Sequence, residues 1–199
     1  ISLPKCTSII WKNTNTNVLP SLTEYKYIQS SGSVWPAYSI LDNLILEGYT
    51  LNFTNVKSST FHKLKIKRHK NIWIGWLYWI VRWWNDTTST NNVFHTIEII
   101  NYDGWLYLNR GASSSYHPTY DIYSNIDIYG ANTWIDLTNT RFNLFNNIHV
   151  HDNKEDGIRI NNNVSYNTFN NIHTHGNTCG IIWSWISYSI DNVFNNVQT

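Results

Sequence analysis

Hydrophobic residues recur along this chain as pairs that enclose two polar positions. In each pair an aromatic or large aliphatic residue stands three places before an aliphatic one, and the first members of successive pairs are 20, 33, 29, 22, 24 and 25 residues apart. A period of this length, built from short β-type strings, is typical of a solenoid in which each coil stacks on the next. The seven pairs are Leu41/Leu44, Phe61/Leu64, Phe94/Ile97, Tyr123/Ile126, Phe145/Ile148, Phe169/Ile172 and Phe194/Val197.

Alternation after each pair predicts a strand with one buried face. In residues 148–151 Ile148 and Val150 would point inward, while His149 and His151 would point outward. The strings at 64–67, 97–100, 126–129 and 172–175 have the same form, and a second short apolar string follows each of them. The pattern predicts an all-β chain.

Asparagine recurs just before the first strand of each repeat. Asn tolerates the left-handed backbone region that a sharp turn requires, and stacked Asn side chains can hydrogen-bond along the axis. We therefore interpret these residues as structural. They are Asn43, Asn125, Asn147, Asn171 and Asn196.

The segments 156–160 and 167–172, which read Asp-Gly-Ile-Arg-Ile and Asn-Thr-Phe-Asn-Asn-Ile, resemble coils of right-handed parallel β-helix proteins. That pectate-lyase-like superfamily includes polysaccharide lyases, polygalacturonases, phage tailspikes and surface adhesins, and the chain is nearest in character to the viral tailspikes and adhesins. The resemblance covers about residues 38–199 and implies a right-handed parallel β-helix of about seven coils. Residues 1–37 would form an N-terminal cap or an irregular first coil.

Four histidines form the sharpest cluster of candidate ligands. His149 and His151 would share an outer face, with His173 and His175 directly above them, 24 residues on. The expected separations of roughly 5 Å between coils and 7 Å along a strand are near those needed for metal ligation through imidazole. Asp127, one coil below His149, could add a ligand or orient a ring. A divalent metal site, a pH-responsive patch and simple copying of coils all account for this pattern.

Aromatic residues form a second candidate site. Trp76, Trp105 and Trp134 would occupy equivalent positions on three adjacent coils, with Tyr78 and Tyr107 beside them. Such a column could fill the core, form a subunit interface or stack against sugar rings.

Catalytic motifs are sparse. The polygalacturonases of this superfamily use clustered Asp residues, a Gly-His-Gly and an Arg-Ile-Lys motif, whereas here Asn161 follows Arg159 and Ile160. The weak catalytic candidates are Asp136, Arg159 and Asp127, with Asp136 and Arg159 expected as paired neighbours on the outer face.

Composition limits the partners. Fourteen basic residues against 13 acidic ones leave a net charge of +1, which does not indicate a nucleic-acid partner. The most apolar window, residues 72–84, is too short to insert across a bilayer.

A chain without Met that begins at Ile1 is expected to be a processed protein or a fragment. A coil left open near Thr199 is expected to be covered by further sequence or by another subunit.

These observations favour a non-catalytic structural or attachment domain on a virion surface or in the extracellular space. With 11 Trp and 13 Tyr, it would contact host or cell-surface glycans through aromatic surface rows. We expect a homo-oligomer, either a trimer or an end-to-end stack. The alternatives are a polysaccharide lyase or glycoside hydrolase of the same fold, and a metal-binding surface module.

Overall fold

The structure is a computed structural model of the 199-residue chain. It describes residues 2–3, 8–10, 26–30, 40–47, 49–52, 58–67, 77–78, 80–81, 90–101, 104–109, 120–130, 135–161, 163–183 and 189–199.

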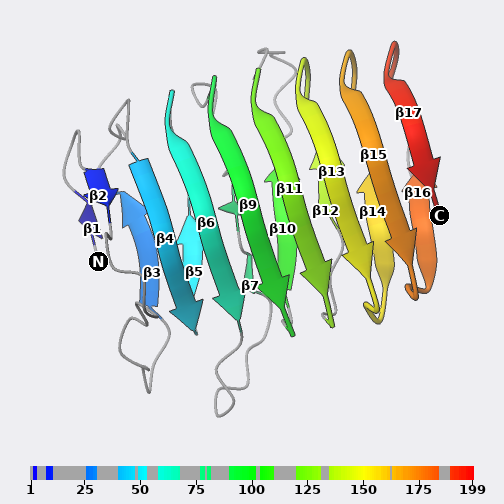
Figure 1. Ribbon diagram of the computed structural model, residues 1–199. Helices are drawn as coiled ribbons and strands as arrows, with labels where there is room; N and C mark the ends of the chain where they lie inside the picture. Colours follow the sequence, from blue (N-terminus) through cyan, green and yellow to red (C-terminus); the bar gives the residue numbers. More distant parts are fainter. Residues whose placement is uncertain are drawn as a thin grey trace.

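Three parallel sheets make up the described part of the chain, which contains no helix (Figure 1). The largest sheet has eight strands: β2 (Ser8–Ile10), β4 (Ile40–Glu47), β6 (Thr60–Lys67), β9 (Val93–Ile100), β11 (Ile122–Tyr129), β13 (Leu144–His151), β15 (Thr168–His175) and β17 (Val193–Gln198). Its strands follow one another in chain order, so each new strand is added at the same edge. The predicted all-β class and parallel pairing are confirmed, and the arrangement is compatible with a solenoid.

The two smaller sheets follow the same order. Five strands form one of them: β7 (Leu77–Tyr78), β10 (Gly104–Asn109), β12 (Ile135–Thr138), β14 (Asp156–Ile160) and β16 (Cys179–Trp183). Four form the other: β1 (Ser2–Leu3), β3 (Lys26–Ser30), β5 (Tyr49–Asn52) and β8 (Ile80–Val81). Figure 1 shows the five-stranded sheet behind the eight-stranded one, with the two chain ends at opposite ends of the stack.

A residue with a left-handed backbone lies inside each long strand and explains the three-residue spacing of the hydrophobic pairs. Phe145 and Ile148 are both buried, although residues three apart on a regular strand face opposite sides. Asn147 between them has φ of 54°, which reverses the alternation. The equivalent residues have φ between 51° and 57°; they are Asn43, Lys63, Thr96, Asn125, Asn171 and Asn196. The expected left-handed conformation is confirmed, but its predicted place before the strand is wrong, because these residues lie within the strands.

The exposed Asn side chains also bond along the axis, as expected. Asn147 Nδ2 donates to Asn125 Oδ1 at 3.0 Å, and Asn171 Nδ2 donates to Asn147 Oδ1 at 3.0 Å. Asn196 Nδ2 continues the row to Asn171 Oδ1 at 2.8 Å. These amides therefore form a continuous row of hydrogen bonds from Asn125 to Asn196.

Aromatic rings stack through the core from β6 to β17 of the eight-stranded sheet, and Leu41 takes the equivalent place on β4. Phe145 lies 4.8 Å from Phe169 and 4.9 Å from Tyr123, measured between ring centroids, with the planes within 7° of parallel. Ile135 and Ile158 of the five-stranded sheet belong to the same buried cluster. The two sheets thus share one hydrophobic core.

We expect Asn147→Ala to lower the free energy of unfolding by about 2 kcal/mol, because a Cβ-bearing residue without a local hydrogen bond is strained at positive φ. Asn147→Gly should cost roughly half as much, since Gly accepts that backbone but loses the amide row. Urea denaturation followed by circular dichroism measures both. Equal costs for Asn147→Ala and the neighbouring Asn146→Ala would contradict this role for the backbone conformation.

Candidate functional site

The outer face of the eight-stranded sheet brings the predicted histidines together. Strand register places His149 opposite His173 and His151 opposite His175 on β13 and β15. On the other side, β11 places Asp127 opposite His149. The predicted register of the cluster is therefore confirmed, because these side chains occupy the outward positions between buried Ile and Val residues.

Three of the four histidines converge. His149 Nε2 lies 3.1 Å from His175 Nε2, and one ring nitrogen from each of His149, His151 and His175 lies within 4.8 Å of the others. The rings of His149 and His151 are 4.2 Å apart between centroids, and the ring of His175 lies 5.0 Å from that of His151. His173 stacks on His149 at 5.0 Å but does not belong to the convergent group. These three histidines are called the histidine cluster below.

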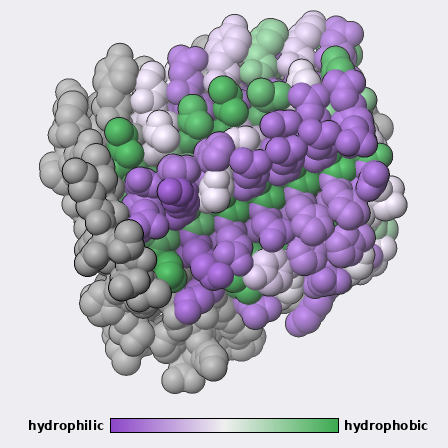
Figure 2. Space-filling model, in the orientation of Figure 1, coloured by the Kyte–Doolittle hydropathy of each residue, from purple (hydrophilic) through white to green (hydrophobic). Residues whose placement is uncertain are grey.

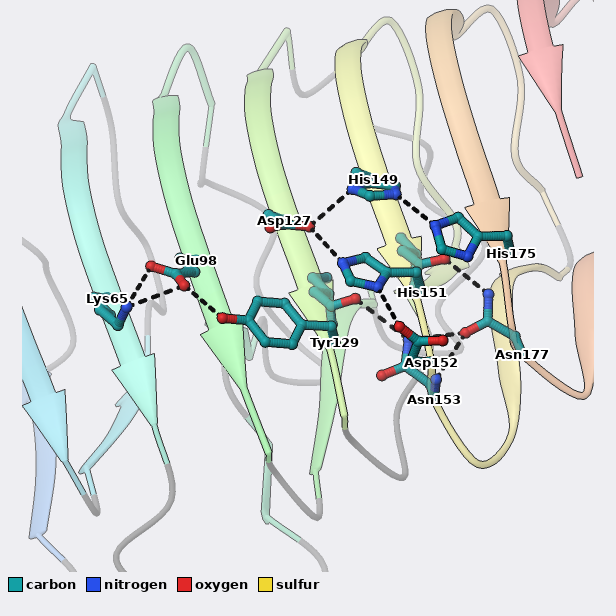
Figure 3. A network of polar contacts seen from close by, with 12 residues as sticks. Lys65, Glu98, Asp127, Tyr129, His149, His151, Asp152, Asn153, His175 and Asn177 are labelled. Atoms are coloured by element: carbon teal, nitrogen blue, oxygen red, sulfur yellow. Dashed lines mark hydrogen bonds and ion pairs between the residues drawn. The ribbon is translucent and has the colours of Figure 1, made fainter.

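Two carboxylates face the histidine cluster from opposite sides (Figure 3). Asp127 Oδ1 lies 3.2 Å from His149 Nδ1 and 3.3 Å from His151 Nε2. This oxygen is shielded from solvent and accepts no hydrogen bond of good geometry. On the other side His151 Nδ1 lies 2.8 Å from Asp152 Oδ2. Both acids can therefore fix the tautomer and orientation of a neighbouring ring.

A glycine makes room for the second of these carboxylates. Gly176 has φ of 62°, and a Cβ added there would lie 2.4 Å from Asp152 Oδ1. Any larger residue at this position would displace the Asp152 carboxylate that contacts His151. Asp152 and Gly176 were not among the predicted site residues, and the signal that they share is their place directly after the histidine-bearing strands.

The surroundings favour uncharged imidazole at the centre of the cluster. Burial lowers the pKa of His149, and repulsion from His151 lowers it further, while the nearby Asp127 acts in the opposite direction. On the rim, the hydrogen bond from His151 lowers the pKa of Asp152. A neutral ring keeps a nitrogen lone pair available to a ligand.

A second polar network lies two strands away on the same face. Lys65 Nζ lies 2.8 Å from Glu98 Oε2, and the Tyr129 hydroxyl donates to Glu98 Oε1 at 2.7 Å. Burial works against ionisation of Glu98, but the bonds from Lys65 and Tyr129 outweigh it and lower the pKa of Glu98. The hydrogen bond to Glu98, followed by burial, raises the pKa of Tyr129 to about 12. The Tyr129 ring stacks on His151 at 5.0 Å, which connects this network with the histidine cluster.

The predicted aromatic column is only partly placed. Trp76 and Trp134 lie outside the described residues, and for Tyr78, Trp105 and Tyr107 the structure describes the strands but not the side chains. The register nevertheless differs from the prediction, because Trp105 lies opposite Tyr78. Since the prediction set Trp105 opposite Trp76, the expected alignment is two residues out, a shift that keeps the strand's faces but changes which residues are neighbours.

A different aromatic row is exposed on the described surface. Tyr120, Phe142 and Tyr166 stack at 5.3 and 5.1 Å between ring centroids. They are 51%, 41% and 40% exposed, and each lies two residues before a long strand. The sequence analysis missed this exposed aromatic row, although its signal is an aromatic residue repeated at intervals of 22 and 24 positions.

The weak catalytic candidates are divided between two sheets. Asp127 lies on β11, whereas Asp136 and Arg159 lie opposite one another on β12 and β14. Asp136 lies between the core residues Ile135 and Leu137, so alternation places it on the outer face, where it is nevertheless only 7% exposed. The Oδ1 atom of Asp136 accepts hydrogen bonds from Thr138 and from Asn161, and these two bonds compensate for its burial. Arg159 Nη2 donates to Asp156 Oδ2 at 2.6 Å.

No protein-family model, curated protein or solved structure matches this chain. Among the residues that the structure describes, none forms a helix long and apolar enough to cross a membrane.

We expect Glu98→Gln to lower the free energy of unfolding at pH 7 by roughly 1 kcal/mol, because the carboxylate is partly exposed. A lowered pKa stabilises the fold above the ordinary Glu pKa, and this contribution is lost as the pH falls through the folded-state value. The difference between wild type and variant should therefore shrink below about pH 4.5. Urea titrations from pH 3 to 8 measure it, and a difference independent of pH would contradict the assignment.

Proposed function

We propose that this chain is a right-handed parallel β-helix of about seven coils, similar to the pectate-lyase-like superfamily, that serves as a non-catalytic structural and attachment domain. The domain would belong to an extracellular or virion-surface protein of the spike or adhesin type and contact host or cell-surface glycans. The observation that carries the contact is the exposed aromatic row of Tyr120, Phe142 and Tyr166.

A rigid shaft is supported by the uninterrupted pairing of the long strands. Seven successive parallel pairings join the strands of the eight-stranded sheet. Buried rings and amide side chains continue across them, so that each repeat stabilises the next. Such a stack resists local opening, which suits a domain that must hold a binding surface in place.

Backbone strain supports a role for the aromatic row. Tyr120, Phe142 and Tyr166 have φ of 50°, 58° and 57°, a region that bulky residues rarely adopt. At the equivalent position, two residues before β6, β9 and β17, the chain has Ser58, Asn91 and Asp191. These polar residue types tolerate the left-handed region. Aromatic residues at the other three positions therefore place the backbone under strain. A contact between these rings and a ligand explains why aromatic residues occupy the positions.

The chemistry of the surrounding surface fits a carbohydrate. Figure 2 shows a broadly hydrophilic face on which rows of hydrophilic residues alternate with narrow lines of hydrophobic ones. Tyr and Phe rings provide apolar area for sugar C–H groups, and the exposed amides of Asn147 and Asn171 on the same strands can bond to hydroxyl groups. The near-zero net charge favours a neutral ligand.

Self-association is supported by hydrophobic exposure beside the edge strand β17. Ile190 and Val193 are about half exposed, and Trp183 on β16 is 42% exposed. Burying these residues against another copy would stabilise a homo-oligomer, and we propose a trimer.

The triple variant Tyr120→Asn, Phe142→Asn and Tyr166→Asn tests the glycan contact. Asn already occupies the equivalent position at residue 91, so the variant should fold with unchanged or higher stability. We expect it to lose binding on a glycan array by at least about tenfold, the loss of one or more aromatic contacts.

Ile40→Asn is the control, because it removes an exposed hydrophobic residue of the same sheet that belongs neither to the aromatic row nor to the proposed oligomer contact, and it should keep binding. Binding retained by the triple variant, or absent from the wild-type chain on a broad array, would overturn the proposal.

Light scattering on the purified chain tests self-association. We expect a mass of three chains, or a concentration-dependent series of larger assemblies. Ile190→Lys with Val193→Lys should shift this mass toward 23.4 kDa, since two charges would enter the proposed contact. A wild-type chain that stays at 23.4 kDa at all concentrations would contradict the oligomer.

A further inference from the structure

We propose that His149, His151 and His175 bind one divalent transition metal ion of the Zn²⁺ type on the outer face of the eight-stranded sheet. The site is independent of the glycan contact, so either proposal can fail without the other. It would link β13 and β15 across their outer surface.

The three imidazole rings form a donor set that suits a transition metal ion. Imidazole nitrogen is a preferred ligand of Zn²⁺, Cu²⁺ and Ni²⁺, and three histidines with an open fourth position are a known zinc arrangement. The three ring nitrogens already lie within 4.8 Å of one another. Ligands at zinc–nitrogen distances with tetrahedral angles are about 3.3 Å apart, so small side-chain rotations would complete the site.

The Nδ1 atoms of two histidines in the cluster contact carboxylates. A histidine that ligates a metal through one nitrogen usually donates its other N–H to a carboxylate or carbonyl. In the histidine cluster, Nδ1 of His149 faces Asp127 and Nδ1 of His151 bonds to Asp152. This leaves Nε2 of His149 for the metal, beside Nε2 of His175 at 3.1 Å. Nε2 of His151 lies 3.3 Å from Asp127 Oδ1, and a rotation of the ring away from that carboxylate would turn it toward the metal.

The three histidine side chains are held in place by the sheet and by their neighbours. The three ligands are outward side chains of paired strands, and register fixes His151 opposite His175. Stacking restricts the rings further, because His151 packs between Tyr129 and His175 at 5.0 Å from each. Since little conformational freedom remains to be lost, the cost of assembling the site is small.

A second histidine pair provides a matched control. His62 and His95 lie opposite each other on β6 and β9 of the same sheet, with ring centroids 5.1 Å apart. His62 Nδ1 lies 2.9 Å from Asp42, which resembles the pairing of His149 with Asp127. The described structure places no third histidine with this pair in a convergent group. Histidines therefore face each other on neighbouring strands at two places, but three of them converge at one place in the described part.

Isothermal titration of the 199-residue chain with ZnCl₂ at pH 7.5, after treatment with a chelator, tests the proposal. We expect one ion per chain, and His151→Ala with His175→Ala should weaken binding at least 30-fold. His62→Ala with His95→Ala should change it by less than about threefold, and His173→Ala should behave similarly. At a zinc concentration 100 times the dissociation constant, the melting temperature should rise by about 5 to 10 °C.

The result that would overturn the site is absence of saturable binding at 100 µM Zn²⁺, or an equal loss in the cluster variant and the His62/His95 control. Circular dichroism checks that each variant folds, and His175→Gln, a change at an exposed residue, replaces the double variant if that one does not.

The variant Asp127→Asn tests whether the carboxylates position the histidine rings for the metal. Asp127→Asn should weaken zinc binding about 10- to 100-fold while leaving the stoichiometry at one. The electron paramagnetic resonance spectrum of the Cu²⁺-loaded chain should show coupling to several ring nitrogens in the wild type and to fewer in His175→Gln. Identical spectra in these two proteins would exclude His175 as a ligand.

Discussion

Hydrogen bonding along the stacking axis is the constraint on which the rest of this structure depends. Each inner strand of the eight-stranded sheet bonds to the strand before and after it, and side chains in the turns repeat that pattern. Asp121 N donates to Asn143 Oδ1 at 2.9 Å, and Asn143 N donates to Asn167 Oδ1 at 3.0 Å. These residues are almost fully buried, so an unpaired amide there would cost about 1–3 kcal/mol. Because each partner belongs to the next repeat, the polar groups hold successive strands in register as firmly as the core does.

That register creates the chemistry of the surface. Outward positions of successive strands form rows with a spacing near 4.8 Å, so the identity of a row follows from which residues share a position. One row passes from Lys65 through Glu98 and Asp127 to His149. Its first two residues form a salt bridge, and its last residue belongs to the histidine cluster, so the chemistry of the row differs between its two ends. The exposed aromatic row arises in the same way at the turns before β11, β13 and β15. Function on such a sheet depends on columns of residues, and a single substitution changes one step of a column.

The all-β class, the parallel strand pairing and the facing positions of the histidines could be predicted because all three depend on repetition. Phe145 and Phe169 occupy the same place in two repeats, and the 24-residue separation that aligns them also aligns His149 with His173. The convergence of His149, His151 and His175 without His173 could not be predicted, because it depends on side-chain rotation. Asp152 was missed for a similar reason, since it reaches His151 only because Gly176 leaves room for it. The Trp105 alignment was wrong by two residues because the repeats vary in length, so equal spacing in the sequence does not guarantee equal register between strands.

Formation of a disulfide between neighbouring strands tests the parallel register most directly. Asn146 and Asn170 are paired on β13 and β15, and their expected Cα separation of about 4.8 Å lies within the range of a disulfide. In a chain whose Cys6 and Cys179 are replaced by Ser, Asn146→Cys with Asn170→Cys should cross-link under mild oxidation. Asn146→Cys with Asn195→Cys should not, because these residues lie two strands apart, at about 10 Å. Mass spectrometry of the non-reduced protein distinguishes the outcomes. Cross-linking of the second pair but not the first would contradict the register on which the histidine cluster and the aromatic row both depend.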